Sequence, residues 1–262
     1  MFSVVIPLYN KELSIKNTIQ SVLDQSFQDL EIVVINDVST DNSVEVMNVF
    51  NDERIRLIHQ QNQGVSAARN RGIEEAKFEW IALLDADDLW KQDHLETFVN
   101  LIEKYPNHLF FASSFEYSTP RESIINRPGV EDYEIEDYFK ESLTEHLVCT
   151  DVVVIKKKCF ETEKYNEDFV RGEDIDLWTR LARKYKIIKS NKVTAIYRTE
   201  AENRSDSNVL DIRKTFFRDV DLSRMKNKFE KKYFKKLMFT KLKYYAVKKE
   251  WNNFFYLLRK FI

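Results

Sequence analysis

Three carboxylates follow one short apolar run in this sequence. Residues Trp80–Leu84 are apolar, and Asp85, Asp87 and Asp88 come directly after them. Such a run is typical of a strand buried on both faces of a parallel sheet. Carboxylates at the end of that strand would face the crevice in which open α/β sheets bind ligands, and oxygen ligands suit hard cations such as Mg²⁺ or Mn²⁺. The alternative is an acidic cap, in which Asp88 or Asp87 precedes a helix that begins near Lys91.

The composition restricts the class of protein. A chain of 262 residues has room for one large α/β domain, or for one domain with an appendage. Its two cysteines, Cys149 and Cys159, are too far apart for a CxxC pair, which indicates a reducing compartment. No apolar run approaches the ~18 residues of a membrane-spanning helix, and no basic region precedes the first apolar run, as it would in a signal peptide. We therefore expect a cytoplasmic protein.

Charge is distributed unevenly along the chain. Residues 216–262 hold 14 basic and 4 acidic residues, a net charge of +10, and the rest of the chain has a net charge of −12. The same segment contains 13 aromatic residues. Basic residues with interleaved aromatics suit an anionic membrane surface, and the acidic body argues against nucleic acid as a partner. Simple packing of these helices on the rest of the protein is the alternative.

Strand and helix patterns alternate from the N-terminus. Short apolar runs predict strands at 4–6, 32–35, 55–58, 80–84 and 109–112, and helical spacing of apolar residues predicts helices at about 13–25, 41–49, 65–76, 95–102 and 175–185. Repeated units of this length imply a mostly parallel, doubly wound sheet. Glycine occurs only at positions 64, 72, 129 and 172, so neither a GxGxxG motif nor a P-loop is present. Any nucleotide must therefore be held by side chains and a metal ion.

Five segments of residues 2 to about 200 resemble the family 2 glycosyltransferases, which have the GT-A fold. The matching segments, in the order in which the family has them, are Ser3–Asn10, Ile35–Ser43, Asn62–Gly72, Asp85–Asp88 and Gly172–Asp174. The resemblance implies an inverting enzyme that transfers a sugar from a nucleotide-diphosphate sugar.

The resemblance also implies roles for individual donor-site residues. Those expected to contact the nucleotide are Pro7, Leu8, Tyr9, Glu12, Asp37, Arg69, Asp85 and Ala86. In this pattern Asp37 accepts a hydrogen bond from the base, Glu12 lies near the ribose and Arg69 reaches the phosphates. Asp87 is the direct ligand of Mn²⁺ or Mg²⁺, and Asp85 reaches the ion through water or contacts the ribose. Asp88 is then expected to be the N-cap of the next helix.

The last segment precedes a helix and would serve the acceptor. An inverting transfer needs a base that takes the proton of the acceptor hydroxyl. The resemblance implies that Asp174 is that base and that Glu173 orients the acceptor. Trp178 either packs against the acceptor sugar or packs in the core. The alternative for both carboxylates is a structural role, in which they cap the helix and interact favourably with the dipole at its N-terminus. Val38 departs from the family, which often has glycine at that position, and residues 115–150 are expected to hold further acceptor contacts.

The combined expectation is a GT-A domain over residues 1–207 and a basic, aromatic-rich helical extension over residues 208–262. We expect an inverting hexosyl- or N-acetylhexosaminyltransferase that uses a UDP-sugar and a glycan or lipid-linked glycan acceptor, in surface polysaccharide synthesis. It would be cytoplasmic or peripheral at the inner face of the membrane. The alternatives are a nucleotidyltransferase on a similar fold, or a catalytically silent module that binds nucleotide-sugars.

Overall fold

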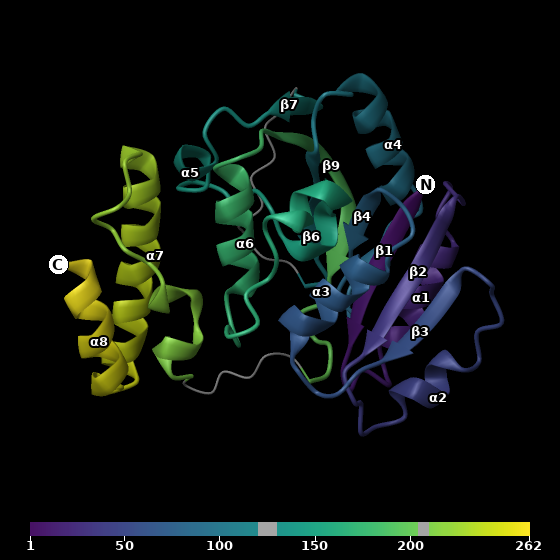
Figure 1. The fold of residues 1–262 in the computed structure, drawn as a ribbon, viewed down its shortest axis with the longest axis horizontal. Coiled ribbons are helices and arrows are strands. Elements are labelled where there is room, and N and C mark those ends of the chain that lie inside the picture. Colours follow the sequence, from purple (N-terminus) through teal and green to yellow (C-terminus); the bar gives the residue numbers. More distant parts are fainter. Residues whose placement is uncertain (120–129, 204–209) are drawn as a thin grey trace.

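A computed structural model describes residues 1–119, 130–203 and 210–262 of the chain. Its sheet has the strand order β3-β2-β1-β4-β8-β6-β9-β5, with β7 paired to β9. Figure 1 shows helices on both faces of this sheet and the two C-terminal helices at one side of the molecule. The fold is therefore a layered α/β domain with a helical C-terminal part, as predicted.

The first half of the sheet is parallel. Its elements are β1 (Phe2–Leu8), α1 (Ile15–Leu23), β2 (Leu30–Asn36), α2 (Ser43–Met47), β3 (Ile55–His59), α3 (Val65–Glu75) and β4 (Trp80–Leu83). Strand β1 lies between β2 and β4 and runs parallel to both. The apolar runs that predicted β1, β2 and β4 are largely buried on both faces, with every residue of β2 buried, whereas β3, at the edge of the sheet, is only partly buried. The carboxyl ends of β1, β2 and β4 therefore meet at one edge.

The second half of the sheet mixes directions. Its elements are β5 (Leu89–Trp90), α4 (His94–Lys104), β6 (Phe110–Tyr117), β7 (Asp132–Glu134), α5 (Tyr138–Glu141), β8 (Val153–Lys156), α6 (Glu173–Ala182) and β9 (Ile187–Tyr197). Strand β8 runs antiparallel to β4 and β6, so the amino end of β8 meets the carboxyl end of β4. The sequence patterns predicted β6 but did not predict β5, β7, β8 or β9.

Helix α3 approaches the sheet closely because it carries small residues on its inner side. Ala67, Ala68 and Gly72 leave room for β1 and β2. A Cβ at Gly72 would lie 3.3 Å from Cγ1 of Ile35 and would overlap the side chain of Val5. This close packing fixes the position of the helix that carries Arg69.

The C-terminal part contains two 3₁₀ turns, Ile212–Lys214 and Phe216–Arg218, followed by α7 (Lys228–Val247) and α8 (Trp251–Phe261). The apolar face predicted for α7 packs inward, since Phe234, Met238 and Tyr245 belong to the same buried cluster as α6 and β8. In Figure 1, α6 lies between the sheet and α7. The predicted domain boundary at 207/208 lies outside the described residues.

Candidate active site

A cleft of about 690 Å³ opens at the carboxyl ends of β1, β2 and β4. The start of α6 forms part of its wall. Ten of the predicted site residues line it: Pro7, Leu8, Tyr9, Asp37, Arg69, Asp85, Ala86, Asp87, Glu173 and Asp174. The structure therefore brings together segments that are up to 167 positions apart in the chain.

Asp37 directly follows β2 and is hydrogen bonded to the loop of residues 60–64. One carboxylate oxygen accepts hydrogen bonds from Gln60 Nε2 (2.7 Å) and the Gln63 backbone N–H (2.9 Å), and the other accepts one from the Gly64 backbone N–H (2.9 Å). Asp37 is 5% exposed. A carboxylate has about four lone-pair sites, so a further hydrogen bond is compatible with this arrangement.

Val38 follows Asp37 in the left-handed backbone region, with φ of 60°. For a β-branched residue this conformation is strained, and strain of this kind costs about 1–3 kcal/mol. The neighbouring Ser39 backbone N–H donates to Asn36 Oδ1 (3.1 Å), which holds the turn in place. The turn at this position, where glycine is expected from the resemblance, therefore takes a left-handed conformation with a β-branched side chain.

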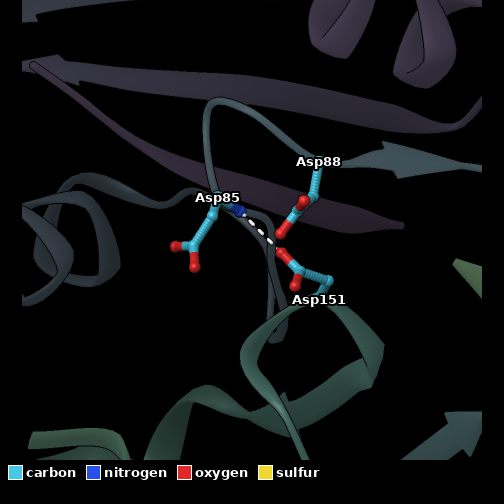
Figure 2. A group of neighbouring side chains, drawn as sticks. All are labelled: Asp85, Asp88 and Asp151. Atoms are coloured by element: carbon cyan, nitrogen blue, oxygen red, sulfur yellow. Dashed lines mark hydrogen bonds between the residues drawn. The ribbon is translucent and has the colours of Figure 1, made fainter. Parts of the chain in front are cut away.

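The acidic side chains at the base of the cleft do not all point the same way (Figure 2). Figure 2 shows the side chains of Asp88 and Asp151 pointing toward each other and that of Asp85 pointing away from them. Asp151 accepts the Asp85 backbone N–H (2.9 Å), and Asp88 accepts the Arg198 backbone N–H (2.6 Å). Burial, with neighbouring carboxylates adding to it, raises the pKa of Asp88 to about 7 and raises the pKa of Asp151 as well. Both shifts favour the protonated form of a carboxyl in this pair.

The carboxylates that line the cleft fit a hard divalent cation. One oxygen from each of Asp85, Asp88 and Asp151 lies within 4.8 Å of the others. Asp87, the predicted direct ligand, is not in this group and is paired with Lys11 (2.7 Å), while Asp85 is paired with Arg69 (2.6 Å). Excess negative charge and oxygen-only donors are the chemistry that Mg²⁺ and Mn²⁺ select.

Arg69 connects the two sides of the cleft. Its guanidinium bonds Asp85 on the sheet side (2.6 Å) and Glu173 at the start of α6 (2.9 Å), and it lies over the Tyr165 ring at 5.2 Å. The side chain is 5% exposed. Its Nε is buried and has no hydrogen-bond partner among the described residues. In this conformation the donors of Arg69 are directed mainly to protein carboxylates, and a phosphate role stays a prediction.

Glu173 and Asp174 occupy the first turn of α6, behind Gly172, its N-cap. Burial raises the pKa of Asp174, and Arg69 opposes that shift. Burial also raises the pKa of Glu173, with Asp174 adding to the shift and Arg69 again opposing it. Carboxyls whose pKa values are moved toward neutrality are suited to acid–base chemistry.

Three predicted residues take other positions. Glu12 accepts two hydrogen bonds from Asn42, at 2.8 Å and 2.7 Å, and is not among the residues that line the cleft. Trp178 is 1% exposed and packs edge-on to Tyr165. It therefore lies in the core, the second of its two predicted positions, and its ring is not accessible to an acceptor. The prediction that Asp88 caps the next helix is wrong, because α4 begins at His94, behind the N-cap Asp93, and Asp88 is turned inward.

Lys11 and Asp151 are site residues that the sequence patterns missed. Lys11 Nζ donates to Asp87 and to the backbone oxygens of Glu202 (2.6 Å) and Asn203 (3.1 Å), which ties the segment after β9 to the start of α1. Asp151 precedes a buried strand instead of following one. A carboxylate before a strand would have pointed to this edge only if β8 had been known to run antiparallel to β4.

The arrangement of the strands and helices, with the cleft at the carboxyl ends of the parallel strands, is the GT-A fold. Residues 3–163 match the family model "Glycosyl transferase family 2", so the chain belongs to that family. The putative teichuronic acid biosynthesis glycosyltransferase TuaG of Bacillus subtilis is 28% identical over 232 residues, 86% of this chain and 89% of TuaG. The glycosyltransferase GlyG of Streptococcus pneumoniae is 35% identical over 120 residues, which span 45% of this chain and 40% of GlyG.

Solved structures share the fold at low identity. TarS of S. aureus, in complex with UDP-GlcNAc, superposes with a TM-score of 0.74 at 18% identity, over 94% of this chain and 72% of that chain. The mannosyltransferase PcManGT of Pyrobaculum calidifontis, in complex with GDP-Man and Mn²⁺, has a TM-score of 0.58 at 19% identity, over 77% and 58% of the two chains. These likenesses establish the GT-A fold of this chain.

Proposed function

We propose that this protein transfers a sugar from a UDP-sugar, with inversion, to a hydroxyl of a glycan or lipid-linked glycan acceptor. The observation that carries the proposal is the single cleft that joins Asp37 and Tyr9 on one side, Asp85 and Asp87 at the base, and Asp174 on the other side. Each set of residues suits one part of the reaction: nucleoside, diphosphate and acceptor.

The nucleoside would lie between the ends of β1 and β2. Tyr9 is 42% exposed, so its ring is available to pack against a base. The carboxylate of Asp37 is held in place by the loop of residues 60–64 and can accept a hydrogen bond from a base N–H. Charged acceptors make stronger hydrogen bonds than neutral ones, which favours Asp37 as the residue that selects the base.

The diphosphate would lie over Asp85 and Asp87, which would hold Mn²⁺ or Mg²⁺. When bound, such an ion neutralises the charge that develops on a departing nucleoside diphosphate. The protein side of this arrangement is rigid. The Asp85 backbone is fixed by Asp151, and Asp87 is fixed by Lys11. A fixed carboxylate pair needs little reorganisation when the donor binds, which is how preorganised sites lower a barrier.

Asp174 would take the proton of the acceptor hydroxyl, on the face of the sugar opposite the leaving group. Arg69 holds Glu173 beside it, so the two carboxylates keep a fixed orientation. Burial raises the pKa of Asp174, which makes its ionised form a stronger base than a solvated aspartate. The sequence has no glycine-rich loop, which argues against a nucleotidyltransferase. Its intact acidic residues argue against a catalytically silent binding module.

The acceptor and the sugar are proposed from the relatives. TuaG is named for teichuronic acid biosynthesis, and TarS was crystallised with UDP-GlcNAc. We therefore place this chain in the synthesis of a surface polysaccharide, as a hexosyl- or N-acetylhexosaminyltransferase. Of residues 115–150, in which acceptor contacts are expected, residues 120–129 lie outside the described part of the chain.

An anionic membrane surface is the proposed location. None of the helices that the structure describes is both long and apolar enough to cross a bilayer. On α8, Trp251 and Phe255 are 51% and 53% exposed and lie one turn apart, and Lys248 and Lys249 are exposed just before them. Exposed rings beside basic residues suit the headgroup region of such a membrane.

Calorimetry with UDP and GDP, each with Mn²⁺ and with a chelator, tests the proposal. We expect UDP to bind more tightly than GDP and the metal to strengthen binding, because Asp85 and Asp87 repel the diphosphate without it. Equal affinity with chelator would show that binding does not require the ion. Tighter binding of GDP would contradict the assignment of uracil as the base. A screen of UDP-sugars for metal-dependent hydrolysis then identifies the donor.

A further inference from the structure

The C-terminal part of the chain returns to the turn that carries the acceptor carboxylates. The Val170 backbone N–H donates to the carbonyl oxygen of Lys214 (2.8 Å), and Arg171 and Thr215 form an isolated parallel bridge. These contacts lie two and three residues before Glu173. The segment that begins the helical extension is therefore attached directly to the entry into α6.

Phe216 lies against Gly172, the residue before Glu173. Gly172 has φ of 77°, in the left-handed region that suits glycine. A Cβ at this position would lie 2.8 Å from Cε1 of Phe216 and closer still to Cδ1. The Phe216 ring is 6% exposed and is itself held by Phe217, whose ring centroid is 4.2 Å away, and by Phe234 of α7 at 6.4 Å.

A left-handed glycine has no side chain to restrict its own backbone, so neighbouring contacts help to define its conformation. Here the backbone bonds of Val170 and Arg171 hold the residues before it, and an aromatic ring anchored in the extension covers the glycine itself. We propose that Phe216 is a positioning residue for the reaction, and that the C-terminal extension holds the turn of Gly172 so that Glu173 and Asp174 face the cleft correctly. This inference rests on the proposed function, which assigns the acceptor chemistry to those two carboxylates.

The donor side of the cleft does not depend on this contact. Asp37 is held by Gln60, Gln63 and Gly64, and these residues lie on the loop that leads into α3. Loss of Phe216 should therefore separate two measurements. Affinity for UDP should be retained, while the rate of transfer at saturating donor should fall.

The test compares Phe216→Ala with Phe217→Ala. Both remove a ring that is 6% exposed, one position apart, but the Phe216 ring supplies all three of the atoms nearest to Gly172. We expect Phe216→Ala to lower kcat by about 10²-fold, the scale expected for a misplacement of about 1 Å, with the Kd for UDP within about 2-fold. Phe217→Ala should keep most of its kcat. Phe216→Leu should recover activity, because leucine retains Cγ and Cδ1.

A double-mutant cycle tests the contact itself. Gly172→Ala should be less harmful to kcat in the Phe216→Ala protein than in the wild type, because the clash with the ring is removed and only the backbone strain remains. If Phe216→Ala does not fold, Phe216→Val replaces it, since valine keeps Cγ atoms but lacks the Cδ1 and Cε1 atoms that come closest to Gly172.

Two results would overturn the inference: kcat of Phe216→Ala equal to that of Phe217→Ala, or a fall in UDP affinity that matches the fall in kcat. Failure of the proposed function is distinguishable, because it would show as normal turnover in Asp174→Asn or as no binding of UDP by the wild type.

Discussion

The two walls of the cleft are built in different ways. The donor wall comes from β1, β2 and β4 and the turns that follow them, so each of its residues lies within a few positions of a strand end. The acceptor wall depends on the start of α6, on the 3₁₀ turn Phe216–Arg218 and on α7, which are brought together only by long-range packing. The donor wall is thus a local product of consecutive βα units, whereas the acceptor wall is a product of tertiary assembly.

Asp174→Asn gives the largest expected effect and divides the two walls. Transfer should fall by at least ~10²-fold, the scale of general base catalysis, because an amide cannot accept the acceptor proton. Affinity for UDP should be unchanged. Steady-state transfer rates and calorimetry measure the two sides.

Asp176→Asn is the matched control for that substitution. Asp176 lies on the same helix but pairs with Arg180 and does not line the cleft, so its kcat should remain near that of the wild type. Near-normal turnover in Asp174→Asn would move the role of base to Glu173 or elsewhere.

Arg69→Met should damage both walls at once, because Arg69 bonds Asp85 on one and Glu173 on the other. Removing one member of a buried ion pair costs about 3–5 kcal/mol of unfolding free energy. Arg69→Lys should recover little, since a single ammonium cannot bridge two carboxylates as a guanidinium does. Denaturant unfolding measures the stability and calorimetry measures UDP affinity.

Arg56→Met is the comparison for Arg69. Arg56 also bridges two carboxylates, Glu31 and Glu75, but its side chain is 29% exposed and lies outside the cleft. Exposed pairs contribute about 0–1 kcal/mol, so this variant should lose less stability and keep its affinity for UDP. Equal losses in the two variants would show that burial of Arg69 has no special importance.

The pH profile of kcat tests the proposed base on the acceptor wall. Burial raises the pKa of Asp174 in the folded protein, and a base acts only when ionised. The kcat should therefore rise with pH until that raised pKa is passed, by about tenfold per pH unit below it. The same carboxyl binds its proton more tightly when folded, so its contribution to stability is greatest below its unfolded pKa and declines as pH rises to the folded pKa. A flat kcat profile would contradict the assignment.

Membrane docking by the extension has the smallest expected effect. Replacing both Trp251 and Phe255 with serine should weaken sedimentation with anionic vesicles, and replacing Lys248 and Lys249 with glutamate should weaken it further, by about 1 kcal/mol for each basic residue lost. Salt should do the same by screening. Truncation near Thr215 would be a poor test, because it would also remove Phe216.

Val49→Ser is the control for the vesicle measurement. Val49 is 66% exposed but follows α2, outside the extension, so its loss should leave sedimentation unchanged. Equal sedimentation with neutral vesicles, or no change in the α8 variants, would show that the extension only packs on the catalytic domain.

The sequence predicted the donor wall well because its signals are local. Apolar runs identified β1, β2, β3 and β4, and the polar residues that follow β1, β2 and β4, such as Asp37 and Asp85, lie where parallel strand ends must place them. The short antiparallel strands gave no comparable signal. Strand β5 has two residues, and its pairing with β9 depends on contacts over 100 positions apart.

What the amino-acid order determined by itself was the alternation of strands and helices and the types of side chain at strand ends, because both follow from the spacing of apolar residues. Only the tertiary structure decided which carboxylates become neighbours. Asp151 joined Asp88 because β8 runs antiparallel beside β4. Trp178 entered the core because α6 packs it against Phe110 of β6 and against Tyr165. Phe216 reached Gly172 because the C-terminal part of the chain packs on the other side of α6 (Figure 1). Such contacts depend on burial of apolar surface between distant segments, which no local pattern encodes.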